Sequence, residues 1–400
     1  MPVALSRTPG YHGPFQVPKT AFFRDFVQKS IIDRYDLAGV VRRGTATAVE
    51  PVGDPPHVRF RVHTAEGPAV EAAAVVVAAG PLGGEANFPA FWADLADRDR
   101  ELARAAGALV HAADLMWAHA PAAARAAALR PAGSVLVVGG GLTAGHLAVR
   151  ALTETTAAAG GRVTLCARGR IKERQFDLDL RWMGRQRTHM LCEHFWGLGP
   201  AERLRATREA KGGGSITPEV LEQLRGFAAR GRFAAMEGAE VASVAWEEGP
   251  RGLGYEASLA ARDGSWLVAF STGEVASFDA IWCATGTVLD ARRDPLLRGT
   301  VEFAAGRADL PDAPTLEGGR TPVLDADLRL VSGLDLFVMG QYAGVQLGPG
   351  ALNLMGGRAG AARIARALTR RNPALGLCAY PCPAGGGGGR EVEAEAVAVS

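Results

Sequence analysis

The amino-acid sequence predicts an α/β protein with two three-layer domains, in which helices cover both faces of a mostly parallel sheet. Three observations predict this fold class. An apolar strand at Ser134–Val138 runs into three glycines and then into a helical pattern. The order of strand, turn, buried strand and glycine occurs twice, ending at Ala79-Gly80 and at Thr285-Gly286. Strands that alternate with glycine turns and helices are typical of doubly wound parallel sheets.

The glycine turn after Val138 has the spacing of a dinucleotide-binding fingerprint. Gly139 allows a tight turn, Gly141 leaves room for a pyrophosphate against the backbone, and Ala144 lets helix and strand pack closely. The helix start offers free N–H groups and a positive dipole end to the phosphates. We therefore expect a Rossmann-like domain here. The expected cofactor-binding residues of this turn are Gly139, Gly140, Gly141, Thr143 and Ala144. An ordinary glycine-rich turn is the alternative interpretation.

A basic segment after the next strand predicts which dinucleotide is bound. Arg162–Ala167 reads as a strand, and the loop after it is where the adenosine ribose should lie. An acidic residue there would favour NADH, whereas this chain has Arg168 and Arg170. Guanidinium groups suit a 2′-phosphate, so we expect NADPH rather than NADH. The alternative is a solvated basic loop that binds no ligand.

The strand at Ala73–Ala79 is expected to be buried on both faces, because it is a continuous apolar run. Together with the strand before Gly286 it forms a loose internal duplication, as expected for one copy per nucleotide-binding domain. The second copy is preceded by the fingerprint described above. The first copy has none, since nothing between Met1 and Val58 reads as strand–GxGxxG–helix.

A third apolar strand with a glycine stop lies near the C-terminus. Leu334–Gly340 reads as a buried strand, Gln341–Gly350 is rich in glycine, and Ala351–Leu368 has helical spacing of its apolar residues. A glycine-proline turn that leads into a helix N-terminus can accept an anion or a carbonyl group. A loop tightened for packing is the alternative. Residues 376–400, with five consecutive glycines, are expected to form a disordered tail.

Composition restricts the class of protein. The chain has 400 residues, of which 48% are hydrophobic and 22% charged, so we expect a globular protein of two or three domains. A net charge of +2 favours neither nucleic acid nor an anionic membrane as the main partner. The five cysteines form no CxxC pair, which disfavours a zinc site and a disulfide reductase and fits a cytoplasmic location. No apolar run is long enough to span a bilayer.

Five motifs give the chain a resemblance to flavoprotein monooxygenases. The motifs are Val137–Ala148, Phe176–Trp182, Gly213–Leu224, Asp279–Gly286 and Leu336–Ile364. From Phe15 to Leu368 the chain resembles FAD- and NAD(P)-dependent oxidoreductases, a group that includes lysine and ornithine N-hydroxylases and flavin-containing monooxygenases. It is most similar to a branch called FAD/NAD(P)-binding oxidoreductases. The last motif is the most specific, because a generic Rossmann protein has no reason to contain it.

The resemblance implies how a flavin is held. In such enzymes the strand that ends at Gly340 and the helix after Gly348-Pro349 close over the flavin. The helix start near Ala351–Asn353 would face the pyrimidine edge and stabilise negative charge on the reduced ring. Many relatives have GD where this chain has Gly340-Gln341, but a glutamine can still bond the ribityl chain. Pro18-Lys19 matches the start of the early helix near the flavin. The cofactor-binding residues added in this way are Gly286, Gly340, Gln341, Gly348, Pro349, Ala351 and Asn353.

The resemblance also implies the domain organisation. A discontinuous FAD-type domain is expected at residues 1–130 and 290–375, around an NAD(P)-binding domain at 131–289. Its first βα unit should stand before Phe15 and is missing, although that strand lies in the middle of such a sheet. We favour a truncated sequence, which predicts coding sequence for this unit upstream of Met1. A degenerate protein that binds NADP but not FAD tightly, or a strand supplied by another chain, are the alternatives.

The implied activity is that of an FAD-dependent oxidoreductase, in which NADPH reduces the flavin. A monooxygenase acting on a small-molecule substrate is the preferred form. Because the cofactor carries the chemistry, no catalytic acid or base needs to be visible in the sequence, and we identify none. The second hypothesis is a non-catalytic, NADP-binding remnant of a flavoprotein.

Overall fold

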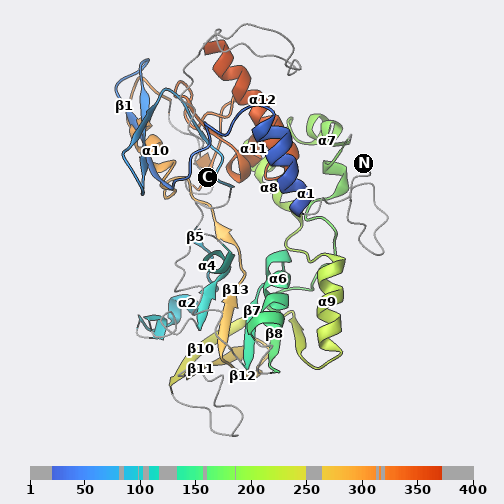
Figure 1. Ribbon diagram of the computed structural model, residues 1–400. Coiled ribbons are helices and arrows are strands. Elements are labelled where there is room, and N and C mark those ends of the chain that lie inside the picture. The colour runs from blue at the N-terminus through green and yellow to red at the C-terminus, as the bar shows by residue number, and fades with distance from the viewer. Residues whose placement is uncertain are drawn as a thin grey trace. The chain divides into compact units, whose positions relative to one another are not determined.

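The computed structural model describes residues 20–80, 85–97, 99–101, 108–116, 133–155, 160–184, 186–248, 264–311, 315–316 and 320–371. The chain forms two compact units (Figure 1). Unit 1 comprises residues 1–85, 178–211 and 289–400, and unit 2 comprises residues 86–177 and 212–288. The division by sequence places 86–130 with the FAD-type domain and 178–211 with the NAD(P)-binding domain. The boundaries expected from the sequence describe which cofactor each segment binds, whereas the two units are defined by their compactness. The expected boundaries therefore stay a prediction. The expected tail at 376–400 lies outside the described residues.

Unit 2 is built on a five-stranded sheet in the order β6-β13-β7-β8-β9. All four neighbouring pairs are parallel. The strands are Leu109–His111 (β6), Ser134–Val138 (β7), Arg162–Ala167 (β8), Phe233–Glu237 (β9) and Ala280–Cys283 (β13). From β7 the chain continues to β8 and β9 on one side and later returns to the other side as β13. This reversal beside β7 is a topological switch point, the place where open α/β sheets bind ligands.

Alternate residues of β7 pack into different layers. Val135 and Val137 share a core with α6 (Leu142–Arg150) and α9 (Pro218–Ala228). Leu136 and Val138 share another core with an antiparallel meander. Its strands are Val241–Glu248 (β10), Gly264–Phe270 (β11) and Val275–Phe278 (β12). Unit 2 therefore has three layers, as the sequence predicts, but one face of the sheet is covered largely by this meander and not by the helices expected there. Its remaining elements are Phe91–Asp94 (α2), Ala112–Met116 (α4), Ala151–Thr155 (η3) and Thr287–Val288 (β14), which pairs with β5 (Glu85–Ala86) at the unit boundary.

A buried carboxylate fixes the starts of β7 and β13. Asp279 is 9% exposed, and its Oδ2 accepts hydrogen bonds from the Gly133 N–H at 2.7 Å and the Ser134 N–H at 2.8 Å. We expect Asp279→Ala to lower the free energy of unfolding by about 2–3 kcal/mol, because both amides lose a charged acceptor. Asp279→Asn keeps an oxygen for both and should cost about 1 kcal/mol. Urea unfolding checks both values, and equal losses would contradict this account.

Unit 1 contains an antiparallel sheet and a parallel strand pair. The sheet is formed by Ala46–Val52 (β1), Arg59–Thr64 (β2) and Val70–Ala72 (β3). The parallel pair joins Val75–Val77 (β4) to Leu336–Val338 (β17). The strand expected at 73–79 is therefore present, but the prediction that it is buried on both faces is wrong. Val76 is 42% exposed, because no described element covers that face of β4.

The main core of unit 1 includes Phe60, Leu336 and Phe337, all of them fully buried, and helices α10, α11 and α12 contribute to it. Helices α7, α8, α11 and α12 lie together in this unit (Figure 1). The longer helices are Thr20–Val27 (α1), Gln186–His194 (α7), Pro200–Lys211 (α8), Arg298–Ala304 (α10) and Leu354–Arg371 (α12). The short elements are Gln28–Asp33 (η1), Leu180–Trp182 (η4), Thr315–Leu316 (β15), Thr321–Pro322 (β16), Gly340–Ala343 (η7) and Gly344–Leu347 (α11).

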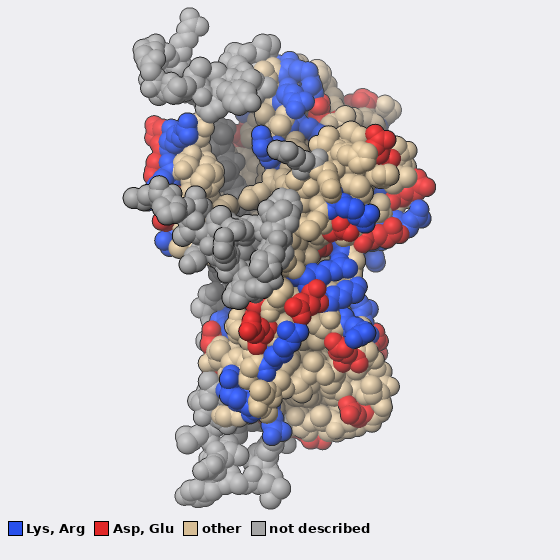
Figure 2. Space-filling view, turned by 90° about the vertical axis from the view of Figure 1, so that its right-hand side faces the viewer, with Lys and Arg blue, Asp and Glu red and all other residues tan. Residues whose placement is uncertain are grey.

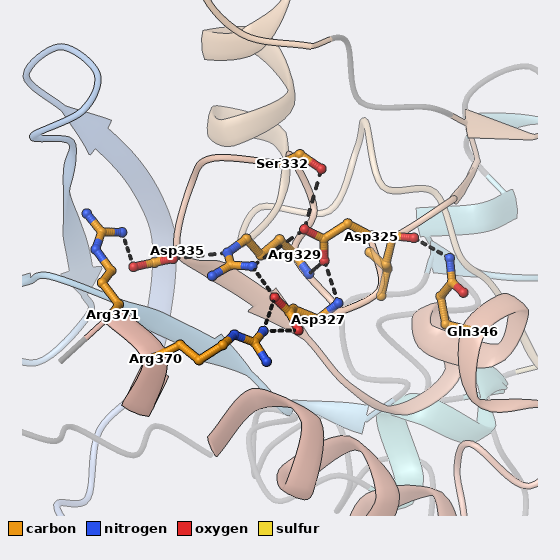
Figure 3. Close-up of polar contacts among 9 residues, drawn as sticks. Asp325, Asp327, Arg329, Ser332, Asp335, Gln346, Arg370 and Arg371 are labelled. Carbon is orange, nitrogen blue, oxygen red and sulfur yellow. Dashed lines mark hydrogen bonds and ion pairs between the residues drawn. The ribbon is translucent and has the colours of Figure 1, made fainter. Parts of the chain in front are cut away.

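An ion-pair network joins the segment before β17 to the end of α12 (Figure 3). Arg329 contacts Asp335 at 3.0 Å and Asp327 at 2.7 Å. Two arginines of α12 complete it, since Arg370 pairs with Asp327 and Arg371 with Asp335. The Asp335 side chain is only 4% exposed, so its charge is compensated inside the protein. Each of these three arginines thus has a carboxylate partner.

Among the described helices, none combines the length and the hydropathy that a bilayer-spanning segment needs. The described residues also contain no cluster of three or more His, Cys, Asp and Glu side chains arranged to hold a metal ion. Cys166 and Cys283 are buried in strands, with 1% and 0% exposure. Burial raises the pKa of the Cys166 thiol to about 11, which favours the protonated thiol at neutral pH.

Candidate dinucleotide and flavin sites

The glycine turn of unit 2 lies between the ends of three strands. Gly139 has a φ of +145°, which disfavours any side chain, and its N–H donates to the Cys166 carbonyl at 2.8 Å. A Cβ placed on Gly139 would lie 2.4 Å from the Ala284 carbonyl oxygen. The turn therefore fits between the C-terminal ends of β8 and β13, at the switch point. This position needs a glycine for both conformation and space.

The turn leads directly into the N-terminus of α6. Gly141 occupies the N-cap position, and no side chain caps the helix. Thr143 lies half-exposed in the first turn. Ala144 is fully buried, and its Cβ would lie 3.3 Å from a Cβ on Gly139, so helix and strand pack as closely as the fingerprint requires. A Cβ on Gly140 would lie 3.3 Å from the Ala167 Cβ at the end of β8. The first turn of α6 can thus accept an anion.

A second glycine loop packs against this turn, and sequence reasoning missed its role. A Cβ on Gly214 would lie 2.7 Å from the Gly141 Cα, so the two backbones are in direct contact. The Lys172 ammonium donates to the Gly212 carbonyl and ties this loop to the basic segment after β8. The run of three glycines at 212–214 overlaps the motif Gly213–Leu224, but no contact with the fingerprint turn is expected from the sequence. Its position just before the proline that starts α9 is the signal that could have identified it.

The two predicted arginines follow β8 at the same edge of the sheet. β7 and β8 are parallel neighbours, with Val138 opposite Cys166, so the loop after Ala167 begins beside the glycine turn. Arg168 and Arg170 are both exposed. The Arg168 side chain is 85% exposed, and its Nε lies 3.9 Å from the Glu240 carboxylate, which is too open to be a strong ion pair. Figure 2 shows Lys and Arg side chains interspersed with Asp and Glu on the face that it draws.

The end of β13 is held by an asparagine from the segment after β5. Asn87 donates its N–H to the Gly286 carbonyl at 3.0 Å and its side-chain amide to the Thr285 carbonyl at 3.1 Å. Gly286 is exposed and has a φ of +82°. Because β13 lies beside β7, Gly286 follows a strand whose end borders the glycine turn. The structure thus gathers all eight predicted unit 2 residues at or next to one edge of the parallel sheet.

In unit 1 the glycines that follow β4 and β17 lie close together. The Met339 N–H donates to the Val77 carbonyl at 2.9 Å, which brings the ends of β17 and β4 together. Gly340 has a φ of +71°, and a Cβ placed on it would lie 3.8 Å from the Gly80 Cα. The neighbouring Gln341 side chain is half-exposed. This edge of the β4-β17 pair is therefore lined by bare backbone, with one amide side chain beside it.

The segment 348–353 is a turn and not the start of a helix. Gly348 and Pro349 are buried, as is Ala351 at 4% exposure, and Asn353 is half-exposed. α12 begins at Leu354, so the expected helix start at Ala351 is wrong. The Asn353 N–H donates to the Gly350 carbonyl, and Gly356 packs so closely that a Cβ there would lie 2.4 Å from the Ala351 Cα. The chain folds back over its own helix instead of continuing it. Pro18-Lys19 lies outside the described residues.

A buried tyrosine–aspartate pair anchors the turn after Gly340. The Tyr342 hydroxyl donates to Asp294 at 3.1 Å, and the Leu296 N–H donates to the same carboxylate at 2.9 Å. Asp294 is 3% exposed. Burial raises the pKa of the Asp294 carboxyl, although both hydrogen bonds oppose this shift. The pair is well placed to hold η7 in position beside β17.

The raised pKa of Asp294 predicts a pH dependence. Because the folded pKa lies above the unfolded value of 3.8, the native state binds more protons there, and stability is lost as pH rises through the folded pKa. Asp294→Asn cannot ionise and can keep both contacts. We therefore expect the free energy of unfolding of the wild type to fall relative to Asp294→Asn between pH 4 and pH 7. Urea unfolding at both pH values measures this, and an unchanged difference would contradict it.

Comparison with known proteins places the fold. No family model matches the chain, and no curated protein matches it in sequence. Solved structures do match. An ornithine N-hydroxylase from Kutzneria sp. 744, solved with FADred, NADP+ and L-orn, is 16% identical with a TM-score of 0.58, and the match covers 88% of this chain and 77% of that one. The ornithine hydroxylase of Pseudomonas aeruginosa is 16% identical, with a TM-score of 0.56 and coverages of 87% and 75%.

A third match points the same way. The L-lysine 6-monooxygenase of Pseudomonas syringae is 19% identical, with a TM-score of 0.53, and the match covers 82% of this chain and 71% of that chain. At these identities the likeness concerns the fold. It confirms the α/β fold class and the resemblance predicted from the sequence. This chain therefore has the fold of the lysine and ornithine N-hydroxylating flavoprotein monooxygenases.

Proposed function

We propose that the protein is an FAD-dependent oxidoreductase that uses NADPH to reduce the flavin, and that it acts as a monooxygenase on a small molecule. The observation that carries the proposal is the turn at Gly139–Gly141. It combines a position that only glycine fits, an uncapped helix start and a place at the switch point of a parallel sheet. The fold likeness to enzymes of this kind supports it.

The unit 2 residues suit a phosphorylated nicotinamide dinucleotide. The first-turn N–H groups of α6 would receive the pyrophosphate, with Thr143 beside them. Arg168 and Arg170 would hold the 2′-phosphate, since exposed guanidinium groups bind phosphate oxygens in a bidentate manner. The contact of Gly214 with Gly141 adds a second bare backbone to the site, and Lys172 adds a charge next to it. Gly286 would border the nicotinamide side of this edge.

The unit 1 residues suit a flavin at the end of the β4-β17 pair. Gly340 and Gly80 present backbone without side chains, and the Gln341 amide could bond a ribityl hydroxyl. The buried turn with Pro349, Ala351 and Asn353 would border the ring. When bound, FAD would supply the redox chemistry, and the protein would orient it and exclude water. The described residues of unit 1 contain no strand–GxGxxG–helix unit, so they do not supply the usual site for the FAD pyrophosphate.

An absorbance spectrum tests the proposal. The purified protein, after incubation with FAD and gel filtration, should show the flavin bands, and anaerobic NADPH should bleach them. Readmitted oxygen should reoxidise the flavin, and in the monooxygenase form part of the oxygen consumed should not be recovered as hydrogen peroxide when a substrate is present. The second hypothesis, an NADP-binding remnant, predicts calorimetric NADPH binding with no retained flavin and no oxygen consumption. A protein that retains no flavin and gives no heat with NADPH would refute both.

A further inference from the structure

Arg363 on α12 is a half-buried cation without a carboxylate partner. Its guanidinium carbon lies 5.7 Å from the centroid of the Trp196 ring, within the range of a cation–π contact. Among the described residues it has neither an ion pair nor a hydrogen bond, so its N–H edge is unused. The negative charge of Asp327 acts on Arg363, but Asp327 is already paired with Arg329 and Arg370.

Two further arginines converge on the same place from α7 and α8. Arg203 donates to the carbonyls of Trp196 and Leu198, which holds its guanidinium against the turn between these helices. Arg187 donates to the Leu347 carbonyl at 3.0 Å, and the Trp196 indole N–H donates to the neighbouring Gln346 carbonyl at 3.3 Å. All these bonds go to neutral carbonyl groups, so no negative charge among them compensates the arginines.

Placing like charges together in a partly desolvated site has a cost. Burial lowers the pKa of the Arg187 guanidinium, and the charge of Arg363 lowers it further. Burial, Arg366 and Arg203 likewise lower the pKa of Arg363. At the C-terminal end of α12, Arg370 and Arg371 are both paired with aspartates (Figure 3). The same helix thus compensates its charges where they support structure and leaves Arg363 uncompensated.

We propose that Arg187, Arg203 and Arg363 form a binding site for a small oxyanion, a ligand that carries a carboxylate or a phosphate group. The planar edge of a guanidinium matches two oxygens of such a group, and Arg363 offers this edge free. Arg203 and Arg187 are fixed by backbone carbonyls and keep further N–H groups for the same ligand. Trp196 lies against Arg363 in a cation–π contact. All of these residues belong to unit 1, so the site is independent of the glycine turn in unit 2.

Thermal unfolding with phosphate or succinate tests the site. Each anion is titrated against sodium chloride at constant pH and ionic strength, without added NADPH. We expect one of them to raise the Tm of the wild type saturably by about 3–5 °C. Arg363→Gln and Arg187→Gln should reduce this rise to about 1 °C. Arg358→Gln removes the same charge from an exposed position on α12 and should keep the full rise. Arg168→Gln/Arg170→Gln removes the proposed 2′-phosphate contacts and shows how much of the residual rise of about 1 °C comes from unit 2.

The ligand-free variants give a second readout. Without an anion, Arg363→Gln should unfold at the same temperature as the wild type or above it, because an uncompensated charge is removed. If Arg363 only packs against Trp196 and supports the fold, Arg363→Gln should have a lower Tm instead. Equal rises in the wild type, Arg363→Gln and Arg358→Gln would show a general salt effect and overturn the proposal. The anion that gives the saturable rise distinguishes a phosphate ligand from a carboxylate ligand. Because neither flavin nor NADPH is needed, these results stand apart from those for the proposed activity.

Discussion

Gly139→Ala is expected to abolish NADPH binding and to lower the free energy of unfolding by about 3 kcal/mol. The added Cβ would lie 2.4 Å from the Ala284 carbonyl oxygen, and the φ of +145° is unfavourable for any residue with a side chain. Neither strand end can yield, because β7 and β13 are hydrogen-bonded neighbours in a buried sheet. The turn must therefore move away from the start of α6. Urea unfolding and isothermal titration with NADPH measure the two effects.

Gly273→Ala is the matched control for the strain of placing a side chain on a residue with positive φ. Gly273 has a φ of +87° in the turn between β11 and β12, and nothing lies within 4 Å of the position its Cβ would occupy. This variant should lose about 1 kcal/mol through strain alone and should keep NADPH binding. The account fails at this point if Gly139→Ala binds NADPH like the wild type, or if Gly273→Ala impairs binding to the same extent.

Replacing Arg168 and Arg170 together with glutamine is expected to weaken NADPH binding by about 10- to 100-fold. NADH lacks the 2′-phosphate, so its affinity should change by less than about threefold. The two arginines follow β8 at the edge where the glycine turn lies, and both are exposed to an incoming ligand. Competition titrations with NADP+ and NAD+ give the ratio. The salt dependence of NADPH binding should become weaker in the double variant, because fewer charges contact the ligand.

Arg162→Gln separates a local contact from a general loss of charge. Arg162 is exposed at the first position of the same strand, so it lies at the opposite edge of the sheet from Arg168. This variant should bind both dinucleotides like the wild type. Equal losses for NADPH and NADH in the double variant would show that the 2′-phosphate lies elsewhere.

Local patterns predict the parallel sheet of unit 2 well. Ser134–Val138 and Arg162–Ala167 form strands with the predicted bounds, because apolar runs between glycines leave little choice of structure. The close packing of Gly139 against the buried Ala144 follows from the same spacing. The resemblance to N-hydroxylating flavoproteins is confirmed in the fold. Short-range periodicity and turn chemistry are sufficient for these features.

Features that depend on contacts distant in sequence are harder to predict. The contact of Gly214 with Gly141 joins segments more than 70 residues apart, and nothing local announces it. The turn at Ala351 has helical periodicity, but Gly356 packs back onto it and delays the helix to Leu354. The exposure of Val76 depends on which element covers β4, and the apolar pattern of the strand carries no such information.

Hydrogen–deuterium exchange with and without NADPH tests the central claim most directly. The claim is that bare backbone at the β7–α6 turn, together with the loop after β8, receives the coenzyme. Binding should slow exchange of the amides in residues 139–147 and 166–174, because the ligand covers these N–H groups and orders the basic loop. Protection confined to unit 1, or exchange that is unchanged at saturating NADPH, would contradict it.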